Sequence, residues 1–221
     1  MHCPIMVYVR IVLTTLLTIT CLLGDNSVEL TQHPLLKALA DNATHALIGA
    51  FTGIAFAVQF HDRTSNLLGW FLIFTCFAVS SLIDVDHFIE ARSWYLEDAT
   101  NLQRRPFLHC SSVIFLLLTF YLCTASLNYF KTSLILGELL CAFITHHTRD
   151  AVRRGYWFCP FGHTGRVSNI GYIVIVNLTP HLVAYIHSIC RSGPLQRFLG
   201  QYIKMSDNYR IGSEGYRYMN V

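Results

Sequence analysis

Four long stretches without a charged side chain most constrain what this chain can fold into. None of them contains Asp, Glu, Lys or Arg, and they cover residues 42–60, 64–83, 106–130 and 169–190. An α-helix needs about 20 apolar residues to cross the hydrocarbon core of a bilayer. In lipid the backbone must satisfy its own hydrogen bonds, which a helix does within one segment. The four stretches therefore predict transmembrane helices.

Two weaker segments add to these four. Residues 131–145 are apolar except for Lys131 and Glu138, and a carboxylate inside a span costs about 2.5–3.5 kcal/mol unless it faces a polar interior. We interpret this segment as a further span. Residues 11–23 form a short apolar stretch behind Arg10, which is also typical of a secretory signal peptide. No convincing small-residue cleavage site follows, so we expect an uncleaved first helix.

The composition supports an integral, multi-pass membrane protein whose main partner is the lipid bilayer. The chain is 53% hydrophobic and only 13% charged, against about 25% charged residues in soluble domains. A net charge of +3 without a block of like charge argues against nucleic-acid binding. We predict an all-α, polytopic transmembrane helical bundle of about five or six spans. Residues 1–190 would form this single domain, and residues 191–221 a polar, partly mobile C-terminal tail.

Histidine and aspartate residues cluster at the ends of the predicted spans. Their nitrogen and oxygen atoms are the ligands that zinc and other divalent cations accept. Two pairs have helical spacing, with Asp84 and His87 at i, i+3 and His146 and Asp150 at i, i+4. The candidate metal ligands are His45, Asp84, Asp86, His87, His109, His146 and Asp150.

Topology predicts that these candidates meet. If the spans alternate in direction, His45 opens the second helix, the 84–87 segment closes the third, and His109 opens the fourth. His146 and Asp150 close the fifth, so every candidate lies at the same membrane face. The alternative is a set of unrelated polar caps at helix ends. Lys and Arg divide evenly between the two faces, so the positive-inside rule does not orient the protein.

Arginines near the candidate ligands suggest an anionic substrate. A guanidinium group matches the oxygens of a phosphate in a two-pronged way, so these residues could clamp a phosphate-bearing or lipid-derived molecule. Ordinary contact with lipid headgroups is the alternative. The residues are Arg92, Arg104, Arg105, Arg149, Arg153 and Arg154.

The order of four short motifs resembles a family of bacterial inner-membrane proteins described as LexA-binding, metal-dependent hydrolases. The motifs are THALIG at 44–49, IDVDH at 83–87, RPFLH at 105–109 and THHTRD at 145–150. The resemblance spans about residues 45–162 and implies that all seven candidates are metal ligands. One loop departs from it. The family has His-Arg-Gly-x-Thr-His-Ser where this chain has RRPFLHC at 104–110, so Arg104 replaces a potential ligand.

These observations lead to one main functional prediction and two rivals. The main prediction is metal-assisted hydrolysis with a divalent metal, most simply zinc, in which Asp86 accepts a proton from bound water and Arg105 stabilises negative charge. Seven candidates exceed the four positions of tetrahedral zinc, so either two ions bind or some residues support the ligands. A non-catalytic membrane protein with a structural or partner-binding role is the first rival. A transporter using Glu138 and His181 is the second.

Overall fold

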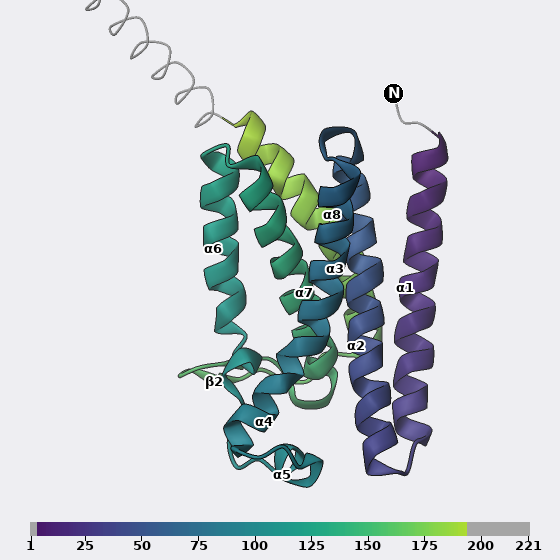
Figure 1. Ribbon diagram of the computed structural model, residues 1–221, viewed down its shortest axis with the longest axis vertical. Coiled ribbons are helices and arrows are strands. Elements are labelled where there is room, and N and C mark those ends of the chain that lie inside the picture. The colour runs from purple at the N-terminus through teal and green to yellow at the C-terminus, as the bar shows by residue number, and fades with distance from the viewer. Residues whose placement is uncertain (1–3, 194–221) are drawn as a thin grey trace, which may run out of the picture.

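The computed structural model describes residues 4–193, which form a bundle of long helices (Figure 1). The prediction of an all-α membrane bundle is confirmed. Four segments are long and apolar enough to cross a membrane, namely Ile5–Leu30, Pro34–Arg63, Asn66–Ala91 and Asn169–Ser192, and Ser112–Ser126 is a shorter apolar helix. The long helices are α1 (Pro4–Leu30), α2 (Pro34–Ala57), α3 (Asn66–Leu82), α6 (Ser112–Ser126), α7 (Phe130–Arg154) and α8 (Asn169–Ser192).

Short elements connect the long helices, and most of them lie at one end of the bundle, drawn at the bottom of Figure 1. The strands pair antiparallel, with Trp157 opposite His163. At the other end a 3-10 helix, η1, joins α2 to α3. The short elements are η1 (Val58–Arg63), η2 (Ile83–Val85), α4 (Asp86–Ala91), α5 (Leu96–Thr100), η3 (Phe107–His109), β1 (Trp157–Phe158) and β2 (Gly162–His163).

The first connector is much shorter than its polar composition indicates. Residues 24–41 read as a polar loop, yet α1 continues to Leu30 and α2 begins at Pro34. Proline suits this first helical position because its fixed φ is already helical and it has no N–H to leave unpaired. Two of the three acidic side chains of this region, Asp25 and Asp41, form ion pairs with Arg149 of α7. Pairing across helices therefore allows a polar sequence to remain helical.

Two other boundaries differ from the hydropathy pattern. The run 106–130 does not form one helix, because α6 begins only at Ser112 and His109 lies in η3 before it. In contrast, α7 passes the expected boundary at His146 and continues to Arg154, where Gly155 ends it with a positive φ of 72°. Helix α8 reaches Ser192, and the rest of the predicted tail, 194–221, lies outside the described residues.

Helix α7 runs through the interior of the bundle and α2 packs tightly on α3. Glu138 of α7 is fully buried, as a carboxyl group inside a span requires if it is to avoid lipid. A Cβ atom added to Gly49 of α2 would lie 2.7 Å from the Cys76 carbonyl oxygen of α3, so glycine permits this approach. The core on either side of α7 contains Phe56, Leu72, Tyr121, Leu134 and Leu140.

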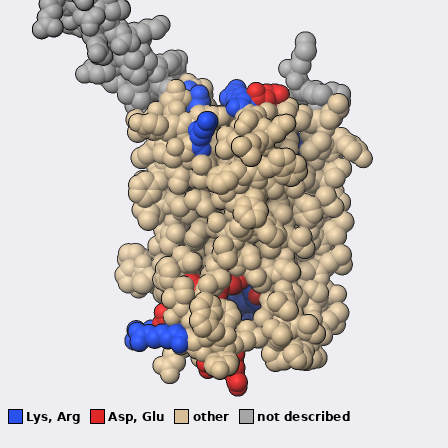
Figure 2. All heavy atoms as spheres, in the orientation of Figure 1, with Lys and Arg blue, Asp and Glu red and all other residues tan. Residues whose placement is uncertain are grey.

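The outer surface of the bundle is apolar over most of its length. Trp70, Phe74 and Leu178 are more than half exposed, which suits contact with lipid rather than water. Figure 2 shows a broad band without charged atoms on the visible face, with Lys, Arg, Asp and Glu confined to the two ends. The surface and the helix lengths together support a chain embedded in a bilayer.

Candidate metal centre

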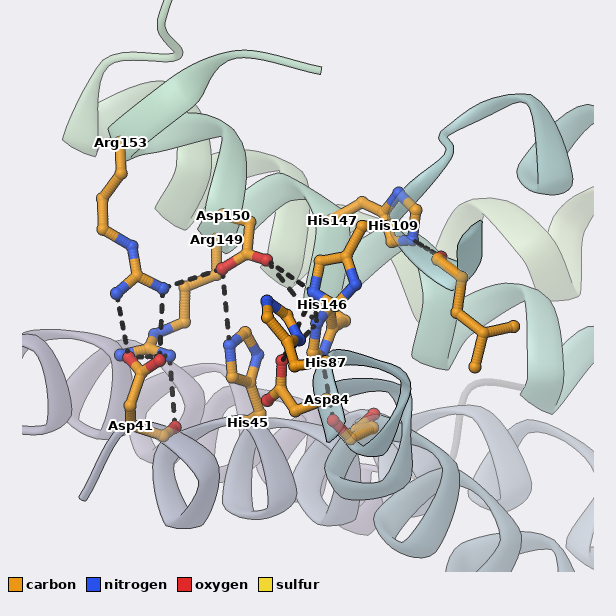
Figure 3. Close-up of polar contacts among 12 residues, drawn as sticks. Asp41, His45, Asp84, His87, His109, His146, His147, Arg149, Asp150 and Arg153 are labelled. Atoms are coloured by element: carbon orange, nitrogen blue, oxygen red, sulfur yellow. Dashed lines mark hydrogen bonds and ion pairs between the residues drawn. The ribbon is translucent and has the colours of Figure 1, made fainter. Parts of the chain in front are cut away.

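Four side chains from three segments converge on one point (Figure 3). This group of four consists of Asp84, His109, His146 and Asp150. His109 Nε2 lies 3.3 Å from Asp84 Oδ1 and 3.3 Å from Asp150 Oδ2. His146 Nε2 lies 3.5 Å and 3.6 Å from the same two oxygens. The two Nε2 atoms are 3.4 Å apart. Residues widely separated in sequence thus place four potential donor atoms together, as the alternating topology predicts.

The spacing of these atoms suits a single tetrahedral ion. Zinc binds nitrogen and oxygen ligands at about 2.0–2.1 Å, which separates the donor atoms of a tetrahedron by about 3.3–3.4 Å. Five of the six separations lie between 3.3 and 3.6 Å, and all the donor atoms lie within 4.8 Å of one another. The donor set is therefore close to what a small divalent cation requires.

Hydrogen bonds orient the histidine rings toward this point. His146 Nδ1 donates to the Ser80 carbonyl oxygen at 2.9 Å, because a carbonyl can only accept. His109 Nδ1 lies 3.2 Å and 3.3 Å from the two carboxylate oxygens of Asp86 and donates to this group. In both rings Nε2 is then the nitrogen that faces the other donors. Metal-binding histidines are commonly held in this way, with the second nitrogen bonded to a carbonyl or carboxylate.

The charge of His109 depends on its acidic neighbours. Burial lowers the pKa of this imidazole, but contacts with Asp150, Asp84 and Asp86 outweigh burial and raise it to about 11. Protonated His109 thus balances part of the negative charge of the three carboxylates. A proton on His109 and a divalent cation would compete for the same carboxylate oxygens.

Asp86 supports His109 rather than completing the group of four. Its side chain is fully buried, and its Oδ2 accepts a hydrogen bond from the Leu108 backbone N–H at 2.8 Å. Its Oδ1 lies 3.3 Å from His87 Nδ1. These contacts suit an orienting role, and the proton-accepting role suggested by the sequence stays a prediction.

Asp86, His87 and His109 form a second, smaller group of potential ligands. It uses His109 Nδ1, whereas the group of four uses Nε2 of the same ring. Two ions would therefore require an imidazole without protons on either nitrogen. Of the two arrangements left open by the sequence, the geometry favours one ion with supporting residues.

His45 lies against the site without joining the group of four. Its ring stacks on that of His146, with centroids 3.8 Å apart and an interplanar angle of 21°. Its Nε2 is 3.6 Å from Oδ1 of Asp150, the oxygen that faces away from the four converging atoms. Contact with both ligand candidates makes His45 a second supporting residue.

Two of the predicted phosphate-clamping arginines are engaged in ion pairs instead. Arg149 is 3% exposed and bonds Asp25 Oδ1 at 2.8 Å and Asp41 Oδ1 at 2.9 Å. Arg153 bonds Asp150 Oδ1 at 2.8 Å and Asp41 Oδ1 at 3.2 Å. These pairs connect α7 to α1 and α2, and a role of the two arginines as a phosphate clamp stays a prediction. The sequence signal for these pairs is the acidic residues Asp25 and Asp41 in the polar stretch between the first two apolar segments.

His147 is a further site residue that sequence reasoning missed. Its Nε2 donates to the Leu108 carbonyl oxygen at 2.9 Å, so its Nδ1 accepts from the Ser111 hydroxyl at 3.1 Å. These bonds hold the η3 segment, and with it His109, against α7. The only sequence signal was that His147 follows His146, and neighbouring helical residues point in different directions.

Arg105 lies beside the metal centre rather than in it. Its guanidinium donates to the carbonyl oxygens of Gly155 and Arg154, both at 3.3 Å, at the end of α7. It also lines a cavity of about 420 Å³ together with Arg104 and Trp157. The predicted catalytic role of Arg105 would require a substrate that extends from this cavity to the group of four.

A bundle of membrane-spanning helices with a His/Asp cluster near one end defines a multi-pass membrane protein with a candidate metal centre. Comparison with known proteins then gives the family. The chain is 35% identical to transmembrane protein 267 of Mus musculus over 175 residues, 77% of this chain and 79% of that protein. The Xenopus laevis protein of the same name is 34% identical over 191 residues, 80% and 81% of the two chains. This chain belongs to the transmembrane protein 267 family.

A further relative supports the same family. The Danio rerio transmembrane protein 267 is 33% identical over 174 residues, 75% of each chain. No family model and no solved structure matches the chain. The resemblance to bacterial hydrolases has no counterpart in these matches and stays a prediction.

Proposed function

We propose that this chain is a metal-binding membrane protein that holds one divalent cation, preferably zinc, through Asp84, His109, His146 and Asp150. The observation that carries the proposal is the direction of the two imidazoles, whose Nδ1 atoms are bonded elsewhere while both Nε2 atoms face two carboxylate oxygens. Two nitrogen and two oxygen donors at tetrahedral spacing suit zinc.

The role that this arrangement supports best is structural. Four protein donors fill a tetrahedral shell, as in sites that stabilise a fold. The donors come from η2 after α3, from η3 before α6, and from two positions of α7. A shared ion would therefore fix these segments to one another at one membrane face.

Metal analysis of the detergent-purified protein tests this proposal. We expect about one zinc per chain in the wild type and less than a tenth of that in His146→Ala and Asp150→Ala. His61→Ala is the matched control, because this exposed histidine lies in η1 at the opposite end of the bundle. Gel filtration would confirm that each variant remains folded. Equal metal content in wild type and His146→Ala, or no metal in any sample, would refute the proposal.

Metal-dependent hydrolysis is the second candidate function. It is favoured because solvent can reach the site: the side chains of Asp84 and Asp150 are 28% and 26% exposed. Arg104 and Arg105 line a cavity where a substrate could bind. When bound, a divalent ion would act as a Lewis acid and lower the pKa of a water molecule, which requires that one of the four protein donors leaves a coordination position open. Arg105 could then hold a phosphate-bearing or lipid-derived substrate through the part of its guanidinium group that its two carbonyl partners leave free.

A phosphodiester assay separates the two roles. Zinc-loaded protein would be incubated with bis(p-nitrophenyl) phosphate, with a chelator as control. A hydrolase should release nitrophenol, with Asp84→Asn inactive and Arg105→Gln showing a raised KM. Absence of turnover by fully loaded wild-type protein would count against hydrolysis of this substrate class and leave the structural role.

A further inference from the structure

A second polar cavity lies at the opposite end of the bundle from the metal centre. It has a volume of about 550 Å³ and lies between α1, η1 and α8. Arg10, Gln59, His181 and Ser188 give it a polar part, and Phe60 and Leu178 contribute apolar walls. In Figure 1 this region is at the top, where α1 begins and where η1 joins α2 to α3.

Gln59 organises the polar part of this cavity. Its Oε1 accepts a hydrogen bond from Arg10 Nη2 at 2.8 Å, and its Nε2 lies 2.8 Å from His181 Nδ1. Because an amide nitrogen only donates, His181 Nδ1 is the acceptor and its Nε2 carries the ring proton. The same amide also donates to the Ala55 carbonyl oxygen at 3.1 Å, which fixes its orientation. One glutamine thus holds an arginine and a histidine donor at the same cavity.

The charge of this cavity is not balanced by acids. No Asp or Glu is among the described residues that line it. Arg63, Lys131 and Arg191 belong to the same end of the bundle, where Asp62 is the single acidic residue at the surface in the range 4–193. Figure 2 shows mainly basic groups at this end of the visible face. A net positive end suits an anionic ligand.

The apolar walls indicate what kind of anion would fit. Leu178 is 57% exposed and Tyr185 is 64% exposed on the outer face of α8, where lipid chains would lie. Phe60 is buried and closes the inner side of the cavity. A ligand with an anionic head beside Arg10 and an apolar tail along α8 would satisfy both parts. A membrane phospholipid has this form.

We propose that this cavity binds the phosphate headgroup of an anionic phospholipid in the leaflet opposite the metal centre. Arg10 contacts the phosphate in the two-pronged manner of a guanidinium, with His181 as a second donor. Gln59 is a positioning residue that holds both. The acyl chains follow the exposed side of α8. This site does not depend on the metal centre.

Native mass spectrometry of the full chain tests the proposal. Protein in detergent would be titrated with phosphatidylglycerol and with phosphatidylcholine of the same acyl chains. We expect phosphatidylglycerol to bind at least about fivefold more tightly in the wild type, and this preference to disappear in Arg10→Gln. Arg63→Gln is the matched control, because it removes a charge at the same end without touching the cavity. Metal content should remain unchanged in Arg10→Gln.

Three outcomes would overturn the proposal. One is equal binding of the two lipids by the wild type. Another is a loss of preference in Arg63→Gln as large as in Arg10→Gln, since this would assign the effect to overall charge. The third is binding of inorganic phosphate alone at the concentration at which the lipid binds. Gln59→Leu adds a check on orientation, and it should lose the preference while its gel-filtration profile remains that of the wild type.

Discussion

At the scale of single residues, His109 connects the candidate ligands to their support. One ring nitrogen faces Asp84, His146 and Asp150, and the other donates to Asp86. The orientation of His109 thus depends on a residue that does not belong to the group of four. Residues that orient a ligand typically affect metal affinity without removing the site.

Asp86→Asn tests this dependence. The amide oxygen could still accept from the Leu108 N–H, but the negative charge that holds His109 Nδ1 would be lost. We expect zinc affinity to fall by about 10–100-fold while the stoichiometry at saturation is unchanged. Competition with a fluorescent chelator measures this, with Glu90→Gln as a control for loss of a nearby charge. An unchanged affinity would show that Asp86 does not orient the ligand.

Metal binding should also depend on pH through His109. Its pKa is raised to about 11 by three carboxylates, so the metal-free site holds a proton at neutral pH. A bound ion needs the neutral ring, so uptake releases this proton and affinity rises with pH. We expect about a tenfold gain per pH unit between about 6 and 8. Calorimetry in buffers of different ionisation enthalpy measures the released proton, and its absence in the wild type would contradict the prediction.

At the scale of secondary-structure elements, the contact between α2 and α3 positions both sides of the site. His45 belongs to α2, and Asp84 follows α3 directly. The two helices approach closely at Gly49, which lies one turn after His45. A change at this contact should therefore affect stability and the metal centre together.

Gly49→Ala tests the contact. The new Cβ would clash with the Ser80 hydroxyl oxygen and would lie 2.7 Å from the backbone oxygen of Cys76, and the backbone cannot move aside as a side chain can. We expect a loss of about 1–3 kcal/mol in stability and weaker zinc binding. Gly69→Ala on α3 has no atom within 4 Å of its Cβ and is the matched control. Thermal unfolding in detergent compares them, and equal midpoints would rule out a tight contact.

The success of sequence-based prediction also differs between elements. Uncharged runs located the helices because exclusion of charge from lipid acts on each residue separately. The predicted end of α1 and the predicted start of α2 are wrong, because Asp25 and Asp41 pair with Arg149, more than one hundred positions away. Helix parity indicated that His109 and His146 would meet. The orienting role of Asp86 could not be predicted, since it depends on which ring nitrogen faces which neighbour.

At the scale of the whole molecule, one buried arginine connects the helices around the candidate metal centre. Arg149 of α7 pairs with Asp25 of α1 and Asp41 of α2, and it lies directly before the ligand candidate Asp150. Its side chain is almost fully enclosed by these contacts. Removal of one partner from a buried ion pair is costly because the remaining charges lose compensation.

Arg149→Met should therefore loosen the bundle while leaving its helices formed. The side chain has similar length, but Asp25 would lose this partner and Asp41 would keep only Arg153. Because both carboxylates are partly exposed, we expect a cost of up to about 3 kcal/mol, the low end of the range for a buried pair. We expect a lower unfolding midpoint, unchanged helix content by circular dichroism, and faster proteolysis between α1 and α2. Arg154→Met at the exposed end of α7 is the control. If Asp25→Asn restores the midpoint of Arg149→Met, unpaired charge is the cause. If the midpoint stays low, unpaired charge on Asp25 is not the cause, and the lost packing of the arginine stem is the larger contribution.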